Sequence, residues 1–196
     1  MIKSKADYYN YLIADRKASP RKRGGLASRI FYSENYYIPK YLEILRKLEY
    51  LTNRRKNLLG RFQYAYTLYV YKKLVFKTQI CIPVNVCGPG INIEHIGNII
   101  INRHAKLGSN CTFQPGVVIG QKDSPQNVPV IGNNVYFGPG AKVIGKVVIG
   151  NNVTIAPNSV VIKDVPDNCI VSGIPAKIIK QNGIKVSDEN QIVFEK

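Results

Sequence analysis

The sequence predicts a mainly β protein in which a parallel β-helix follows an N-terminal α-helical region. Two observations carry this prediction. Large apolar residues recur at every sixth position from Ile101 onward, and the composition of the chain changes near Gln79. We therefore expect a helical, basic and tyrosine-rich region over residues 1–79 and a β-helix domain over residues 80–182. A polar tail, residues 183–196, follows them.

The change in composition is mainly a change in charge. Residues 1–80 hold 18 Lys and Arg against 5 Asp and Glu, a net charge of +13, whereas the rest of the chain holds 10 against 7. Twelve of the 13 tyrosines also precede residue 80. A basic region suits an anionic partner such as an anionic membrane surface or a lipid-linked substrate, and a solvated helical face is an equally weighted alternative. No nucleic-acid-binding motif is present in it, so we expect no nucleic-acid partner.

Three helices are expected in this basic region. Residues 39–56 begin with Pro39, a residue favoured at helix starts, and carry charges on the face opposite their leucines, so they predict an amphipathic helix. Residues 59–78 partly alternate between apolar and polar, but their length favours a helix that packs against the others. Residues 5–17 predict a first short helix, with "ASPRKRGG" as the loop that follows it. The leucines of the amphipathic helix are Leu42, Leu45, Leu48 and Leu51.

The six-residue period predicts the β-helix. It fits neither a helix nor a plain alternating strand, but it fits a short strand followed by a tight corner. Glycine, asparagine and aspartate tolerate the positive φ that such corners require. Three faces then close a coil of 18 residues, and successive coils pair at the strand spacing of about 4.8 Å. The first positions of the hexads are Ile101, Leu107, Phe113, Ile119, Pro125, Ile131, Phe137, Val143, Ile149, Ile155 and Val161.

The fifth positions of the same hexads are small or β-branched, which suits a narrow prism filled from the first and fifth positions. Residues 121–130 break the pattern, because this block is polar and places Pro125 at an inward position. Lys122, Asp123 and Gln126 do not belong in an apolar prism, so we predict a loop that leaves the helix there. The regular fifth positions are Ala105, Cys111, Val117, Val135, Ala141, Val147, Val153, Ser159 and Val165.

The sequence also sets expectations for compartment and metals. The N-terminus lacks the apolar core of a signal peptide, and no apolar run approaches the roughly 20 residues of a membrane span, so we expect a cytoplasmic protein. Cys81, Cys87, Cys111 and Cys169 form no CxxC pair, and reduced thiols are the expected state. A metal enzyme of the carbonic anhydrase kind needs about three histidine ligands. The chain has two histidines, so we expect no metal.

Two stretches carry a resemblance to a known family. "GPGINIEHIGNIIINRHAKLGSNCTFQPGVVIG", together with "GIPAKIIK" after "VIKDVPDN", resembles the left-handed β-helix acyltransferases. Within that group it is similar to serine acetyltransferases and to related acetyltransferases of bacterial polysaccharide loci. The resemblance covers residues 80–182. It implies a left-handed helix, transfer of acetyl from acetyl-coenzyme A to a hydroxyl, and a homotrimer with sites between neighbouring subunits.

The resemblance also implies site residues. The family motif has an acid followed by a histidine at Glu94 and His95, although serine acetyltransferases usually carry aspartate at the first position. A histidine with a pKa near neutrality suits a general base, and a neighbouring carboxylate can hold its tautomer or the acceptor. A buried structural histidine is the alternative for His95. His104 lies at a hexad corner, and we expect an exposed turn residue there.

The donor site is implied in the same way. In the family, pantetheine lies along a groove between coils, where small residues are needed, although corner geometry alone asks for the same residue types. Ala176 and Lys177 lie where the nucleotide end approaches in the family, and the ammonium group of Lys177 suits a phosphate partner. The matching positions here are Gly120, Gly138, Pro139, Ala156 and Pro157 in the groove, with Ala176 and Lys177 at the nucleotide end.

The chain departs from the family at the positions that serve the acceptor. Serine acetyltransferases carry an Arg-His pair in the loop before the helix resumes, where this chain has Asn127 and Val128. This departure puts serine in doubt and favours O-acetylation of a sugar hydroxyl, on a small-molecule or lipid-linked acceptor of capsule or surface polysaccharide biosynthesis. Serine O-acetylation in cysteine biosynthesis and a non-catalytic β-helix scaffold remain the alternatives.

Overall fold

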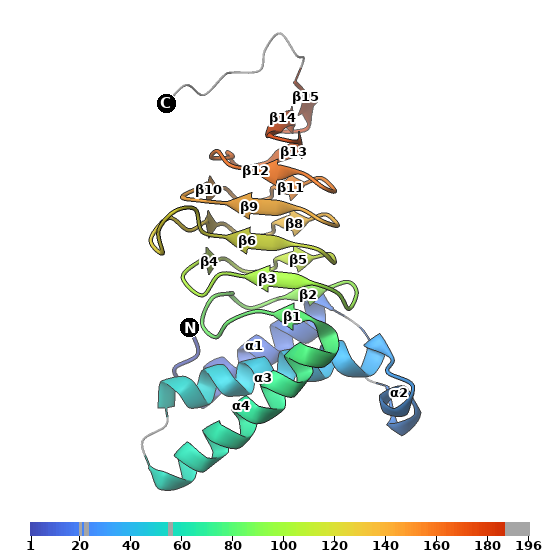
Figure 1. Ribbon diagram of the computed structural model, residues 1–196, viewed down its shortest axis with the longest axis vertical. Coiled ribbons are helices and arrows are strands. Elements are labelled where there is room, and N and C mark those ends of the chain that lie inside the picture. Colours follow the sequence, from blue (N-terminus) through green and yellow to red (C-terminus); the bar gives the residue numbers. More distant parts are fainter. Residues whose placement is uncertain (20, 22–23, 55–56, 187–196) are drawn as a thin grey trace.

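A group of four helices closes one end of a β-helix in the computed structural model (Figure 1). The structure describes residues 1–19, 21, 24–54 and 57–186. The chain runs through the helices first and then climbs the β-helix coil by coil toward the C-terminus. The helices are α1 (Lys5–Ala18), α2 (Leu26–Ile30), α3 (Glu34–Arg54) and α4 (Leu58–Thr78).

The strands of the β-helix form three sheets, one on each face of a prism. A five-stranded sheet has the order β1-β3-β6-β9-β12, a three-stranded sheet β10-β7-β4, and a seven-stranded sheet β15-β14-β13-β11-β8-β5-β2. All pairs are parallel except β13–β14 and β14–β15. The strands are β1 (Ile80–Cys81), β2 (Asn92–Ile93), β3 (Ile99–Ile101), β4 (Lys106–Leu107), β5 (Thr112–Phe113), β6 (Val118–Gly120), β7 (Val130–Ile131), β8 (Tyr136–Phe137), β9 (Lys142–Ile144), β10 (Val148–Ile149), β11 (Thr154–Ile155), β12 (Val160–Val161), β13 (Cys169–Gly173), β14 (Ala176–Gln181) and β15 (Ile184–Lys185).

The inward positions predicted from the hexads are confirmed. Every first position except Pro125 is buried, and so are the regular fifth positions. The rings of Phe113 and Phe137, at equivalent places in successive coils, stack with their centroids 5.1 Å apart. Stacking like residues on like residues therefore fills the prism along its axis.

Asparagines hold one corner of the prism. Asn110, Asn134, Asn152 and Asn168 all have positive φ angles, which asparagine tolerates better than most residues. Their side chains form a ladder, in which each Nδ2 donates to the Oδ1 of the next asparagine over 2.9–3.1 Å. The polar residues of the hexads thus close the backbone turn and also bond successive coils.

The register confirms the predicted loop. Between β7 and β10, Val130 pairs with Val148, so that coil has 18 residues. Between β4 and β7, Lys106 pairs with Val130, so that coil has 24 residues. The six extra residues belong to the segment before β7, and Pro125 there is exposed. Within this loop the Lys122 N–H donates to the Asn127 carbonyl over 3.0 Å. The 121–129 segment is therefore a compact excursion from one coil.

The helices have the caps that their sequences suggest. Ser4 accepts from the Asp7 N–H, and the Asp7 carboxylate accepts from the Ser4 N–H, which is a capping box at the start of α1. Asn57 accepts from the Gly60 N–H at the start of α4, and Gln79 ends that helix in the left-handed conformation. The predicted helices over 5–17 and 59–78 are confirmed as α1 and α4.

The predicted start of the third helix is wrong. α3 begins at Glu34, so Pro39 lies inside the helix and not at its first position. Proline has no N–H, so it leaves the Asn35 carbonyl without its usual helical partner. The Gly24 N–H donates to that carbonyl over 3.0 Å and replaces the missing bond. The short helix α2 was not predicted, and residues 187–196 of the predicted tail lie outside the described residues.

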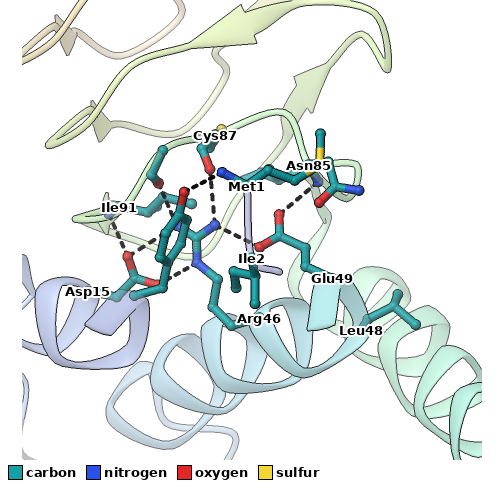
Figure 2. Close-up of polar contacts among 12 residues, drawn as sticks. Met1, Ile2, Asp15, Arg46, Leu48, Glu49, Asn85, Cys87 and Ile91 are labelled. Atoms are coloured by element: carbon teal, nitrogen blue, oxygen red, sulfur yellow. Dashed lines mark hydrogen bonds and ion pairs between the residues drawn. The ribbon is translucent and has the colours of Figure 1, made fainter. Parts of the chain in front are cut away.

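Arg46 of α3 joins the helices to the first coil (Figure 2). Its guanidinium is fully buried and contacts two carboxylates, with Nε 2.7 Å from Asp15 Oδ2 and Nη1 2.9 Å from Glu49 Oε2. It also donates to the carbonyls of Cys87 and Gly88 over 3.0 and 2.6 Å. Burial works against its charge, but Glu49 and Asp15 outweigh this effect and raise the pKa of Arg46 above its ordinary value.

The two carboxylates beside Arg46 bond the coil as well. Asp15 Oδ1 accepts from the Gly90 and Ile91 N–H groups over 2.8 and 2.9 Å, and Glu49 Oε1 accepts from the Asn85 N–H over 2.8 Å. Two tyrosines of the helices form hydrogen bonds with the backbone of Ile82. Its N–H donates to the Tyr41 hydroxyl, and its carbonyl accepts from the Tyr71 hydroxyl. Helix side chains thus satisfy backbone groups that a further coil would otherwise pair.

α4 packs against α3 with one face and exposes the other. Phe62, Tyr66, Tyr69 and Phe76 are exposed along the helix, and the helix carries no acidic residue. Among the described residues, no helix combines the length and apolar character that crossing a bilayer requires. Contact of this region with a membrane surface stays a prediction.

Replacing Arg46 with methionine tests the joint between the helices and the coil. We expect Arg46→Met to lower the free energy of unfolding by about 3–5 kcal/mol, because the Asp15 and Glu49 carboxylates remain buried without a cation. Arg54→Met, at an exposed position of the same helix, is the matched control, with an expected loss below about 1 kcal/mol. Urea denaturation measures both, and equal stabilities would contradict this role of Arg46.

Candidate functional site

One corner of the prism brings most of the predicted site residues into a single row. The first residue of each corner bonds to the coil above it. The N–H groups of Glu94, Gln114, Gly138 and Ala156 are the donors, and the carbonyls of Phe113, Phe137, Ile155 and Val171, in that order, are the acceptors. The corner residues after β2, β5, β8 and β11 therefore lie one above another. We call residues 94–95, 114–115, 138–139 and 156–157 the His95 edge. At about 4.8 Å per coil, His95 and Pro157 at its two ends are separated by roughly 14 Å.

Other predicted residues lie outside this edge. Ala176 pairs with Gly173 at the top of the seven-stranded sheet, and the exposed Lys177 pairs with Ser172. Gly120 ends β6, so the five-stranded sheet separates it from the His95 edge within one chain. His104 is exposed in a turn on that far side, as predicted. Asn127 and Val128 lie on the same far side, in the 121–129 loop.

His95 is an exposed residue with one polar partner. Its side chain is 60% exposed, so the alternative of a buried structural histidine does not hold. Its Nδ1 atom lies 3.1 Å from Oε2 of Glu34, the first residue of α3. Nε2 makes no hydrogen bond with any residue that the structure describes. One ring nitrogen of this exposed side chain is therefore engaged, and the other makes no hydrogen bond to the described residues.

Glu34 is the functional candidate that sequence reasoning missed. It lies 61 residues before His95, and no local pattern links the two. The only signal was its rarity, since it is one of five acids among the first 80 residues. The predicted neighbour Glu94 instead accepts from Asn92 Nδ2 over 2.6 Å. The acid beside His95 in sequence is thus not its partner in this structure, and a role for Glu94 toward the acceptor stays a prediction.

Further contacts hold the Glu34 carboxylate. Its Oε1 accepts from the Ile96 N–H over 2.8 Å, and Arg21 Nη1 lies 3.7 Å from Oε2. Arg21 also donates to the Glu94 carbonyl. Partial burial by itself raises the pKa of the Glu34 carboxyl, but the bond from Ile96, the contact with His95 and the charge of Arg21 outweigh it. The pKa of Glu34 therefore lies below its ordinary value.

The two groove glycines differ in what surrounds them. A Cβ on Gly138 would lie 2.7 Å from the Pro157 nitrogen and 2.9 Å from the Ile155 oxygen, which are backbone atoms of the next coil. Coil packing alone therefore requires glycine at 138. A Cβ on Gly120 would approach the end of the Ile144 side chain at 3.1 Å, and that side chain can move. Among the described residues, no group of three or more His, Cys, Asp or Glu side chains could hold a metal ion.

Comparison with known proteins confirms the predicted resemblance to hexapeptide-repeat acyltransferases, and to serine acetyltransferases among them. Residues 129–163 match the family described as bacterial transferase hexapeptide (six repeats). The serine acetyltransferase of Synechococcus elongatus is 43% identical over 101 residues, which cover 50% of this chain and 41% of that protein. The chain thus spans less than half the length of this curated relative.

Solved structures agree on the fold. A serine acetyltransferase from Brucella abortus superimposes with a TM-score of 0.70 at 24% identity, over 91% of this chain and 71% of that one. The Neisseria gonorrhoeae serine acetyltransferase in complex with serine gives a TM-score of 0.64 at 26% identity, over 90% and 71%. These similarities imply that the β-helix is left-handed and that the N-terminal helices belong to the shared architecture.

Alanine at the two groove glycines separates coil packing from donor binding. We expect Gly138→Ala to lower the free energy of unfolding by about 1–3 kcal/mol, because the new methyl group overlaps backbone of the next coil. Gly120→Ala should fold with near wild-type stability and raise the KM for acetyl-coenzyme A. Urea denaturation and steady-state kinetics measure the two effects. An unchanged KM in Gly120→Ala would remove Gly120 from the donor site.

Proposed function

We propose that this protein is an acetyl-coenzyme A-dependent O-acetyltransferase of the serine acetyltransferase type, with His95 as the general base. The observation that carries the proposal is the position of His95. Its ring is exposed at one end of the His95 edge, below the stacked pairs Gly138–Pro139 and Ala156–Pro157. The similarity to serine acetyltransferases supports the acetyl donor.

The chemistry follows from what a hydroxyl lacks. A hydroxyl is a weak nucleophile, and it needs a base that accepts its proton as it attacks the thioester carbonyl. The Nε2 atom of His95, which Glu34 does not engage, accepts that proton while the new C–O bond forms. The C–S bond then breaks, and the imidazolium returns the proton to the leaving thiolate of coenzyme A. Backbone N–H groups at a corner are suited to stabilise the intermediate oxyanion.

The donor would lie along the coils above His95. Gly138, Pro139, Ala156 and Pro157 are the proposed groove residues, and Ala176 and Lys177 lie near the end where a nucleotide phosphate would be neutralised. Gly120 lies on the far side of the five-stranded sheet within one chain. We therefore place it in a site that a neighbouring subunit of a homotrimer completes.

The acceptor is the finer question. The similar proteins are named serine acetyltransferases, which supports serine as acceptor better than the polysaccharide sugar that the sequence reasoning favoured. One observation still favours a different hydroxyl. The loop positions where the resemblance places an Arg-His pair are Asn127 and Val128, neither of which can supply a positive charge. Serine is therefore the first acceptor to test, and a sugar hydroxyl is the second.

Thiol release from acetyl-coenzyme A, measured with serine and with a panel of sugars, tests the proposal. We expect release with a hydroxyl acceptor, and we expect His95→Ala to lower kcat by about 10²–10⁴-fold, the usual contribution of a general base. This variant should still bind coenzyme A, which calorimetry measures. Glu43→Gln is the control, since Glu43 pairs with Lys40 on α3 and belongs to neither edge of the proposed site.

Each outcome separates one alternative. Release with sugars and none with serine would return the acceptor to the polysaccharide hypothesis. Full turnover in His95→Ala would remove His95 from the chemistry. Coenzyme A binding without turnover on any acceptor, or no binding at all, would favour the non-catalytic scaffold.

A further inference from the structure

The Glu34 carboxylate bridges the ring and the backbone of the loop that holds His95. Oε2 lies 3.1 Å from His95 Nδ1, and Oε1 lies 2.8 Å from the Ile96 nitrogen. One carboxylate therefore contacts the ring and also the amide of the next residue. The ion pair with Arg21 is longer, at 3.7 Å, so the contacts with His95 and Ile96 dominate its placement.

We infer that Glu34, at the start of α3, is a positioning residue that holds the His95 ring in the tautomer with its proton on Nδ1. The inference rests on the proposed function, because it concerns the same histidine. It adds that the carboxylate which prepares the base comes from the helical region and not from the β-helix. Glu34 acts through His95 and touches no reacting atom.

The tautomer follows from hydrogen-bond chemistry. An ionised carboxylate only accepts hydrogen bonds, so a neutral imidazole facing it must carry its proton on Nδ1. The lone pair then lies on Nε2, the nitrogen that Glu34 does not engage. The Glu34 carboxyl stays ionised near neutral pH, because its pKa lies below the ordinary value. The arrangement leaves Nε2 ready to accept a proton from a hydroxyl.

The helical region can hold this carboxylate only because α3 is fixed in two places. Near its start, the Asn35 carbonyl accepts from the Gly24 N–H, and Arg21 contacts both Glu34 and the Glu94 carbonyl. In its fourth turn, the buried Arg46 donates hydrogen bonds to the Cys87 and Gly88 carbonyls of the first coil. Glu34 therefore has a defined position relative to the coil.

The acid beside His95 in sequence is not a competitor for this role. The Glu94 carboxylate accepts from Asn92 Nδ2 over 2.6 Å, and no described contact joins it to the His95 ring. Glu94 directly follows β2, and its side chain is held by that of Asn92, two residues earlier in the chain. Glu34 is therefore the carboxylate that contacts the His95 ring, and Glu94 is available to contact another group.

Imidazole ¹⁵N NMR tests the tautomer directly, because the chain has only two histidines. At a pH where the ring is neutral, we expect His95 in the wild type to show a protonated Nδ1 and an unprotonated Nε2. In Glu34→Gln an NH2 donor replaces one of the two carboxylate oxygens, so when the remaining oxygen accepts from the Ile96 N–H, the NH2 group faces His95 Nδ1 and opposes a proton there. We expect the His95 signals to move toward a tautomer mixture while those of His104 stay unchanged.

Kinetics provide the second readout. We expect Glu34→Gln to lower kcat by about 10- to 100-fold, which is part of the contribution of a general base, with the KM for acetyl-coenzyme A unchanged. Glu43→Gln is the matched control: it makes the same change on the same helix, at a carboxylate that pairs with Lys40 over 3.7 Å. Its kcat and its His95 signals should equal those of the wild type.

The outcomes separate this inference from the proposed function. A His95 tautomer that is the same in wild type and Glu34→Gln would overturn the inference, even if His95→Ala abolishes turnover. Equal losses of kcat in Glu34→Gln and Glu43→Gln would also overturn it. A tautomer change in a protein that transfers no acetyl would support the positioning contact and refute the proposed function, because the NMR measurement needs no substrate.

Discussion

The buried charges around Arg46 close the open end of the β-helix, and the rest of the molecule depends on that closure. A parallel coil presents a row of unpaired N–H and C=O groups at its first turn, and such groups are costly to bury. Here Arg46 bonds two of the carbonyls, while Asp15 and Glu49 bond three of the N–H groups. The guanidinium and the carboxylates neutralise one another's charge, so each can remain buried while it forms hydrogen bonds with the backbone of the coil.

This closure also connects the helices to the chemistry. Because α3 is anchored on the first coil through Arg46, its first residue Glu34 reaches the loop of His95. The helical region is then more than a lid on the prism, since it contributes a side chain to the candidate site. Bonds from Arg21 and Gly24 hold the start of α3 in the same way.

Much of the β-helix could be predicted because its rule is local. A six-residue period specifies which residues point inward, where corners fall and where the 121–129 segment leaves the coil. The contacts of Arg46 with Asp15 and of Glu34 with His95 obey no local rule, since they join residues 31 and 61 positions apart through the docking of helices on a coil. The helix start at Glu34 was missed for a similar reason, because Gly24 supplies the bond that Pro39 cannot make.

Native-state hydrogen exchange at Asn85, Gly90 and Ile91 tests the closure most directly, because side chains of the helices are the acceptors for these three amides. If the helices close the coil through Arg46, Asp15 and Glu49, the three amides should exchange as slowly as those between interior coils, through global unfolding. Exchange near the rate of unprotected amides, with the interior coils still protected, would show that the end of the β-helix is open and would contradict the account.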